Sequence, residues 1–243
     1  MQKIEDKLHT GKKLFLFDRA YISEFVYGGI DGAITTFAVV AGAAGANADL
    51  KWVLIFGFAN LIADGFSMSV GNFLSVKAEH EDYDKHREIE YWEIENLREK
   101  EIEEIREIYA AKGFKGELLE QVVEVITSND DVWVDTMMKE ELEMAKDDKA
   151  PIQTATATFL SFIAIGLIPL LSYLAAIIFD LGKGNLFLYS CIATGIGLIV
   201  VGNLKAVATR TNRFRAIAET LSLGGIAAFL AYFVGEVLQR YLL

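Results

Sequence analysis

Long hydrophobic runs occupy both ends of the chain, and a polar segment separates them. Five runs are long enough to cross a bilayer core of about 30 Å, which needs about 20 helical residues. These runs are Ile22–Ala46, Trp52–Val76, Ile152–Phe179, Leu186–Ala206 and Ile217–Leu238. Continuous apolar runs indicate helices, because the strands of a membrane barrel alternate polar and apolar residues. We therefore expect an all-α membrane protein with five transmembrane helices.

Between the second and third runs, the pattern changes to charged residues at helical spacing. Ala78–Ala111 contains neither glycine nor proline and predicts one long helix that continues the second run. Gly113 is placed to end this helix as a C-terminal cap. A second, amphipathic helix is predicted over Gly116–Thr127 and a third over Asp130–Lys146. The polar segment is thus expected to be a three-helix domain inserted between two spans.

Charge divides the chain in the same way. Residues 79–148 hold 24 acidic and nine basic residues, so this segment carries a net charge of −15 and the rest of the chain +4. We expect three parts: residues 1–78 with the first two spans, an acidic helical domain over 79–150, and the last three spans over 151–243. The acidic domain disfavours binding to nucleic acid, whose phosphates attract basic surfaces.

Basic residues in the short flanks predict the orientation in the membrane. Lysines and Arg19 precede the first run, and Lys205 and three arginines lie between the fourth and fifth. The positive-inside rule then places the N-terminus and the acidic domain in the cytoplasm and the C-terminus outside. The short termini carry no targeting extension, which favours a prokaryotic plasma membrane over a vacuolar one.

Four glutamates form a stripe in the first predicted helix of the acidic domain. Glu90, Glu93, Glu101 and Glu104 are spaced by 3, 8 and 3 residues. On a continuous helix these side chains fall within an arc of roughly 80°. Carboxylates crowded on one face repel one another unless a cation lies among them, so the stripe predicts a cation site. The alternative is a solvated helix face with ion pairs between neighbouring turns.

The third predicted helix adds two methionines and another glutamate. Met137, Met138 and Glu141 share an arc of about 100° at helical spacing. A thioether adds nothing for Mg²⁺ or Ca²⁺, but it suits later first-row metals. The mixed ligand set therefore favours Fe²⁺, with Mn²⁺, Co²⁺ and Zn²⁺ as further candidates. Methionine also fills hydrophobic cores, which is the alternative role for both residues.

Acidic residues also lie within the first two runs. Asp31 falls in the first run, and in the second Asp64 and Met68 are four residues apart on one helical face. An ionisable group at membrane depth is a functional candidate by default, because burying it in lipid is costly. Glu24 lies two turns before Asp31 on the same face, which suggests a path from the cytoplasmic side. The alternatives are an interhelical hydrogen bond for Asp31 and simple packing for Met68.

Two stretches carry a family resemblance. GGIDGAITTFAVVAG (Gly28–Gly42) and SMSVGNFLSVKAE (Ser67–Glu79) resemble the vacuolar iron transporter family, as do the five spans and the insert after the second. The chain departs from that family at Asn72, where many members have a glutamate. This difference affects expectations for proton coupling and metal preference, and Asp64 is a partial substitute for the missing carboxylate.

The resemblance implies a function and a set of roles. The glutamates and methionines of the insert match the family's cytoplasmic metal-binding domain, and Asp31 and Met68 match its intramembrane metal site. It further implies a homodimer with its pathway at the interface of the first spans. This dimer would export Fe²⁺ from the cytosol in exchange for protons, with iron as substrate and no prosthetic group.

Two other classes of protein remain as alternatives at this stage. A membrane-anchored di-iron enzyme typically uses paired Glu-x-x-His motifs, and no such motif occurs in the sequence. A membrane-anchored metal sensor or scaffold would need no acidic residues at membrane depth, yet Asp31 and Asp64 are there. We therefore expect a transporter rather than an enzyme.

Overall fold

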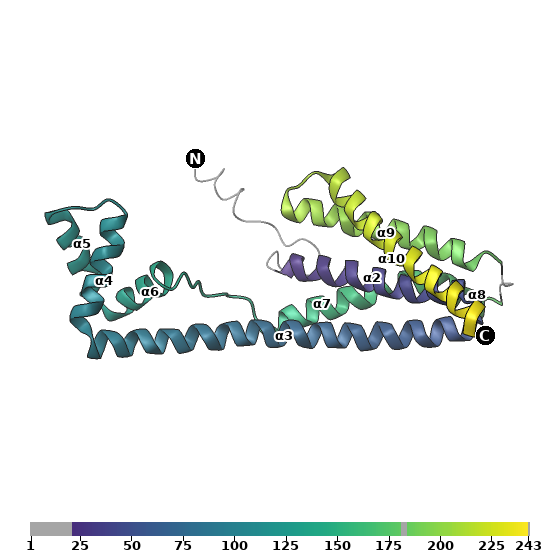
Figure 1. The fold of residues 1–243 in the computed structure, drawn as a ribbon, viewed down its shortest axis with the longest axis horizontal. Helices are drawn as coiled ribbons and strands as arrows, with labels where there is room; N and C mark the ends of the chain where they lie inside the picture. The colour runs from purple at the N-terminus through teal and green to yellow at the C-terminus, as the bar shows by residue number, and fades with distance from the viewer. Residues whose placement is uncertain (1–20, 181–183, 243) are drawn as a thin grey trace. The chain divides into compact units, whose positions relative to one another are not determined.

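The computed structural model describes residues 21–180 and 184–242, and every regular element within them is a helix (Figure 1). The chain divides into two compact units. One combines residues 1–74 with 149–243 and is called the membrane unit here. The other comprises residues 75–148 and is called the acidic unit. Helix α3 (Leu50–Asn96) contributes residues to both.

The five predicted spans are confirmed as helical segments long and apolar enough to cross a membrane, within the described residues. Their bounds are α2 (Ile22–Gly45), the first part of α3, the segment Pro151–Ile178, α9 (Leu186–Thr209) and α10 (Arg213–Leu242). Large apolar side chains remain exposed on them, as suits helices that face lipid. Examples are Phe56, Ile62, Phe66, Ile192, Ile196, Phe229 and Phe233.

The third span differs from the uninterrupted helix predicted over Ile152–Phe179. It consists of α7 (Pro151–Gly166), a short 3₁₀ segment η2 (Ile168–Leu170) and α8 (Leu171–Ile178). Pro169 lies in the 3₁₀ segment, where its ring and missing N–H interrupt the α-helical hydrogen bonds. The Ser190 hydroxyl donates a hydrogen bond to the Pro169 carbonyl oxygen at 2.7 Å, which satisfies that buried group.

Helix α2 is the centre of the membrane unit and packs against α7, α9 and α10. Glycines permit its close approach to two of them. A methyl group added at Gly32 would lie 2.5 Å from the carbonyl oxygen of Phe162 on α7. One added at Gly235 on α10 would collide with the backbone of Gly42. Small residues allow such contacts where no hydrophobic force drives membrane helices together.

The single helix predicted over Ala78–Ala111 is wrong. Helix α3 ends at Asn96, and α4 (Arg98–Ala111) begins after Leu97, whose backbone is not helical (φ −125°, ψ 29°). Neither glycine nor proline causes this break. Burial accounts for it, because the bend brings Ile94 and Ile105 into one hydrophobic core with Trp133 and Val134. In the acidic unit α4 turns steeply away from the end of α3 (Figure 1).

The remaining helices of the acidic unit are α5 (Glu117–Thr127) and α6 (Asp130–Glu140). Asn129 caps α6, since its side-chain oxygen accepts hydrogen bonds from two backbone N–H groups. The predicted extension of this helix to Lys146 is wrong. Glu143 adopts a left-handed backbone conformation (φ 53°), which an α-helix cannot contain. The unit therefore has four helical segments rather than the three expected.

Candidate metal centre

Three glutamates from separate segments of the acidic unit converge on one point. Carboxylate oxygens of Glu90 on α3, Glu101 on α4 and Glu141 after α6 all lie within 4.8 Å of one another. On a straight helix Glu90 and Glu101 would be about 16 Å apart along the axis. The bend at Leu97 therefore creates the site, and the tertiary fold gathers what the predicted stripe would have spread out.

Two of these carboxylates are buried without hydrogen-bond partners. Glu90 is 3% exposed and Glu101 is 1% exposed. Within the part of the chain that the structure describes, Oε2 of Glu90 and both carboxylate oxygens of Glu101 have no hydrogen-bond partner. Burying an unpaired carboxylate is costly, so the arrangement calls for a bound cation or for protons. This observation distinguishes the cluster from a solvated acidic surface.

The electrostatics of the cluster point the same way. Burial, and then the negative charges of Glu141, Glu93 and its other acidic neighbours, raises the pKa of Glu90 to about 7. Burial and then Glu104 and Glu93 raise the pKa of Glu101 to about 7. Partial desolvation and the same two neighbours also raise the pKa of Glu141. All five predicted glutamates thus interact within one cluster.

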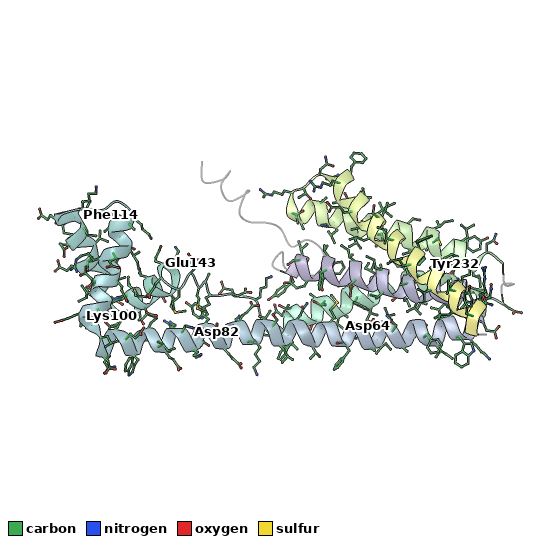
Figure 2. All side chains as sticks on the ribbon, viewed as in Figure 1. Asp64, Asp82, Lys100, Phe114, Glu143 and Tyr232 are labelled. Carbon is green, nitrogen blue, oxygen red and sulfur yellow. The ribbon has the colours of Figure 1, made fainter. Side chains whose placement is uncertain are left out.

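Lys100 is a member of this cluster that the sequence reasoning missed (Figure 2). Its Nζ lies 2.6 Å from Glu104 Oε1 and 3.7 Å from Glu101 Oε1. Its charge lowers the pKa of Glu101 and of Glu141, against the effect of burial. The four-residue spacing from Lys100 to Glu104 was the available sequence signal.

Met137 and Met138 lie in the hydrophobic core of the acidic unit, with exposures of 0% and 1%. Their core neighbours include Trp133 and Ile105. Glu141 follows α6 directly, and its backbone N–H donates to the Met137 carbonyl at 3.0 Å. The methionines therefore belong to the turn that carries a cluster glutamate. Their role as sulfur ligands stays a prediction.

In the membrane unit, Asp31 on α2 and Asp64 on α3 lie close enough for their charges to interact. Both side chains are partly buried. Among the described residues neither carboxylate makes a hydrogen bond or an ion pair, and the Thr35 hydroxyl donates to the backbone carbonyl of Asp31 instead. The two carboxylates are thus free to receive a cation.

The other residues on the α3 face that carries Asp64 differ in their contacts. Met68 is partly buried on this face. Asn72 donates a hydrogen bond to the Thr158 hydroxyl on α7 at 2.8 Å, so it ties two helices together. The buried Nδ2 of Asn60 has no hydrogen-bond partner in the described part of the chain. Asn72 therefore makes an interhelical hydrogen bond in this chain.

Glu24 is held by two donors. Lys149 Nζ lies 2.7 Å from Glu24 Oε1, and the Ser23 hydroxyl donates to Glu24 Oε2 at 2.8 Å. The lysine is 125 residues away in sequence, so no local pattern could have indicated this pair. Ser23 also lines a cavity of about 610 Å³ between α2 and α9. Lys205 and Arg210 line the same cavity.

Comparisons with known proteins identify the family of this chain. The sequence profile of the VIT family matches residues 22–236. A vacuolar iron transporter of Toxoplasma gondii is 34% identical over 225 residues, which cover 90% of this chain and 74% of that protein. Vacuolar iron transporter 1 of Oryza sativa subsp. japonica is 32% identical, over 90% of this chain and 85% of that protein. The corresponding protein of Arabidopsis thaliana is 31% identical, over 90% and 86%. With the match to the family profile spanning nearly the whole chain, this protein belongs to the VIT family.

Proposed function

We propose that this chain transports divalent metal ions, and Fe²⁺ foremost, out of the cytosol across a membrane. The observation that carries the proposal is the convergence of Glu90, Glu101 and Glu141, because buried oxygens of Glu90 and Glu101 have no hydrogen-bond partner among the described residues. We propose iron as the main substrate because the relatives are named vacuolar iron transporters. The five candidate spans support transport across a lipid bilayer.

The acidic unit acts as a collector of metal on the cytosolic side. Its net negative charge raises the local concentration of divalent cations. The glutamate cluster then binds them, with Glu93 and Glu104 supporting the three convergent carboxylates and Met137 and Met138 contributing thioether sulfur. A ligand set of oxygen and sulfur suits Fe²⁺, and it also admits Mn²⁺, Co²⁺ and Zn²⁺.

The membrane unit provides the path. Glu24 receives the ion, and Asp31, Asp64 and Met68 hold it at membrane depth while it sheds water. A proton that arrives from the opposite side competes for the same carboxylates, because metal ligands must be deprotonated. That competition makes exchange of metal for protons the simplest coupling. The activity requires no chemical transformation of a substrate, and a homodimer is the assembly that we propose.

Reconstitution into liposomes tests the proposal. Wild-type protein is expected to move Fe²⁺ from the face that carries residues 75–148, and to move protons in the opposite direction. Asp31→Asn should abolish the flux, because it removes a charge from the path without changing the size of the side chain. Fe²⁺ flux through Asp31→Asn at the wild-type rate would disprove the proposed path.

A further inference from the structure

The carboxylate of Glu24 is already fully engaged. One oxygen accepts from the Lys149 ammonium at 2.7 Å and the other from the Ser23 hydroxyl at 2.8 Å. The Glu24 side chain is 12% exposed, so water does little to weaken the ion pair. A metal ion that binds this carboxylate therefore competes with the lysine.

The backbone fixes Lys149 in this position. It directly precedes Ala150 and Pro151, and Pro151 begins α7. The Ala150 N–H donates to the Tyr21 hydroxyl at 3.1 Å, and the Tyr21 side chain is buried. Two contacts thus hold the start of α7 against the start of α2. The lysine is presented to Glu24 and does not sample the surface as a long exposed side chain would.

The charges make the ammonium a competitor for a cation. Lysine carries one positive charge on a compact head group, and a divalent metal ion carries two. Both seek the same carboxylate oxygens, but only the ammonium is attached to the chain. A monovalent ion from solution gains no charge advantage over the lysine, whereas a divalent ion does.

We propose that Lys149 is a tethered counter-ion that gates access to Glu24 and favours divalent over monovalent cations. This inference rests on the proposed function, because it takes Glu24 to be part of the metal path. Lys149 is also joined by residues 142–148 to Glu141 of the glutamate cluster. These residues therefore connect the glutamate cluster to Lys149 along the chain.

The test is the Fe²⁺ concentration dependence of transport in proteoliposomes. Lys149→Gln removes the charge and nearly keeps the length of the side chain, so the KM for Fe²⁺ should fall about three- to fivefold. Lys149→Met should do the same and serves if the glutamine variant folds poorly. Lys149→Arg keeps the charge and should keep the KM within about twofold of wild type. Addition of K⁺ should inhibit the two neutral variants more than it inhibits wild type.

The membrane unit offers a matched control. Lys205 pairs with Glu219 at 3.0 Å, and its side chain is 34% exposed, close to the 31% of Lys149. Lys205→Gln should leave the KM unchanged. In a Glu24→Gln background, Lys149→Gln should lower the KM much less than it does in wild type, because the coupling between the two residues is already lost.

The outcomes separate this inference from the function on which it rests. If wild type carries iron but both neutral variants keep or raise the KM, the gate is disproved and the transporter stands. If Lys149 has only a structural role, its substitution should lower the maximal rate and the melting temperature without lowering the KM. That result would also count against the gate. If wild type carries no iron in either direction, the proposed function itself fails.

Discussion

The two units of this molecule differ in how their carboxylates are grouped and partnered. The acidic unit brings glutamates from separate segments to one point, where buried oxygens of Glu90 and Glu101 have no hydrogen-bond partner among the described residues. The membrane unit keeps its acids in smaller groups: Glu24 is ion-paired, and Asp31 lies near Asp64. A collecting site gains from tight binding, whereas a site on a path must also release its ion. Under the proposed function, the acidic unit would collect metal and the membrane unit would pass it on.

The largest expected effect separates the two units directly. Asp31→Asn should reduce the maximal Fe²⁺ flux by at least about 100-fold, since the path depends on that charge. Glu101→Gln should weaken Fe²⁺ binding to the full-length protein by about 10- to 100-fold but leave the flux at saturating iron within about threefold. Flux assays paired with equilibrium titrations measure both. Equal loss of maximal flux in the two variants would remove the distinction between collector and path.

Met137→Leu sharpens the comparison from the side of the acidic unit. Leucine preserves the volume of this buried side chain, so the melting temperature should change by less than about 2 °C. If the thioether is a ligand, Co²⁺ and Fe²⁺ should bind about five- to tenfold more weakly, and Mn²⁺ should change less. Competition titrations at fixed pH measure the change. Unchanged affinity for all three metals would assign this methionine to packing alone.

The raised pKa values predict a pH dependence of the acidic unit. Folding raises the pKa of Glu90 and Glu101 to about 7, so the folded state holds protons that the unfolded state releases above its ordinary value near 4.5. Their contribution to stability is complete below that value and is lost as the pH rises through 7. Without metal, the unit should melt about 5 °C lower at pH 8 than at pH 5.5, as followed by tryptophan fluorescence of the full chain.

A bound divalent ion should reverse this trend, because it needs the deprotonated carboxylates. Glu101→Gln is the matched variant, since it removes one of the two titrating groups and should flatten the pH profile. A metal-free melting temperature that rises between pH 5.5 and 8 would contradict the crowding of these carboxylates.

The smallest expected effect concerns the cap of α6. Asn129→Ala removes two hydrogen bonds to the first turn and should cost about 1 kcal/mol. The acidic unit should then melt about 2–4 °C lower, and metal affinity should fall by less than about threefold. Asn96, whose side chain bonds to the Trp92 carbonyl near the end of α3, provides a comparison site in the same unit. A large loss of metal affinity on removing the cap would show that the cluster depends on this turn.

The lengths of the apolar runs and the capping residues were enough to predict much of the fold. The spans follow from apolar runs that only a membrane or a large core could bury, and the first, third, fourth and fifth spans begin and end close to the predicted bounds. Gly113 follows α4 with φ 101°, a conformation that suits glycine, as expected of a C-terminal cap. These features depend on residues near one another in sequence, so a local pattern suffices to predict them.

The features that the sequence could not supply depend on distant contacts. Nothing near Leu97 signals a break, because the cause is a shared core with Trp133 more than 30 residues away. The end of α6 at Glu140 follows from the left-handed backbone of Glu143, a residue with no strong turn preference. The pair of Glu24 with Lys149 joins the starts of the first and third spans, which are 125 residues apart in sequence. Tertiary packing outweighed helix propensity in the first of these cases.

The break at Leu97 also constrains how the acidic unit tolerates change. Leu97 is 40% exposed, so many side chains should fit there. One inserted residue in this turn, however, would rotate everything after it by about 100° and turn Glu101 away from Glu90. Substitutions at Leu97 should therefore be tolerated, whereas insertions and deletions there should not. The number of residues between Glu93 and Glu101 matters more than their identity.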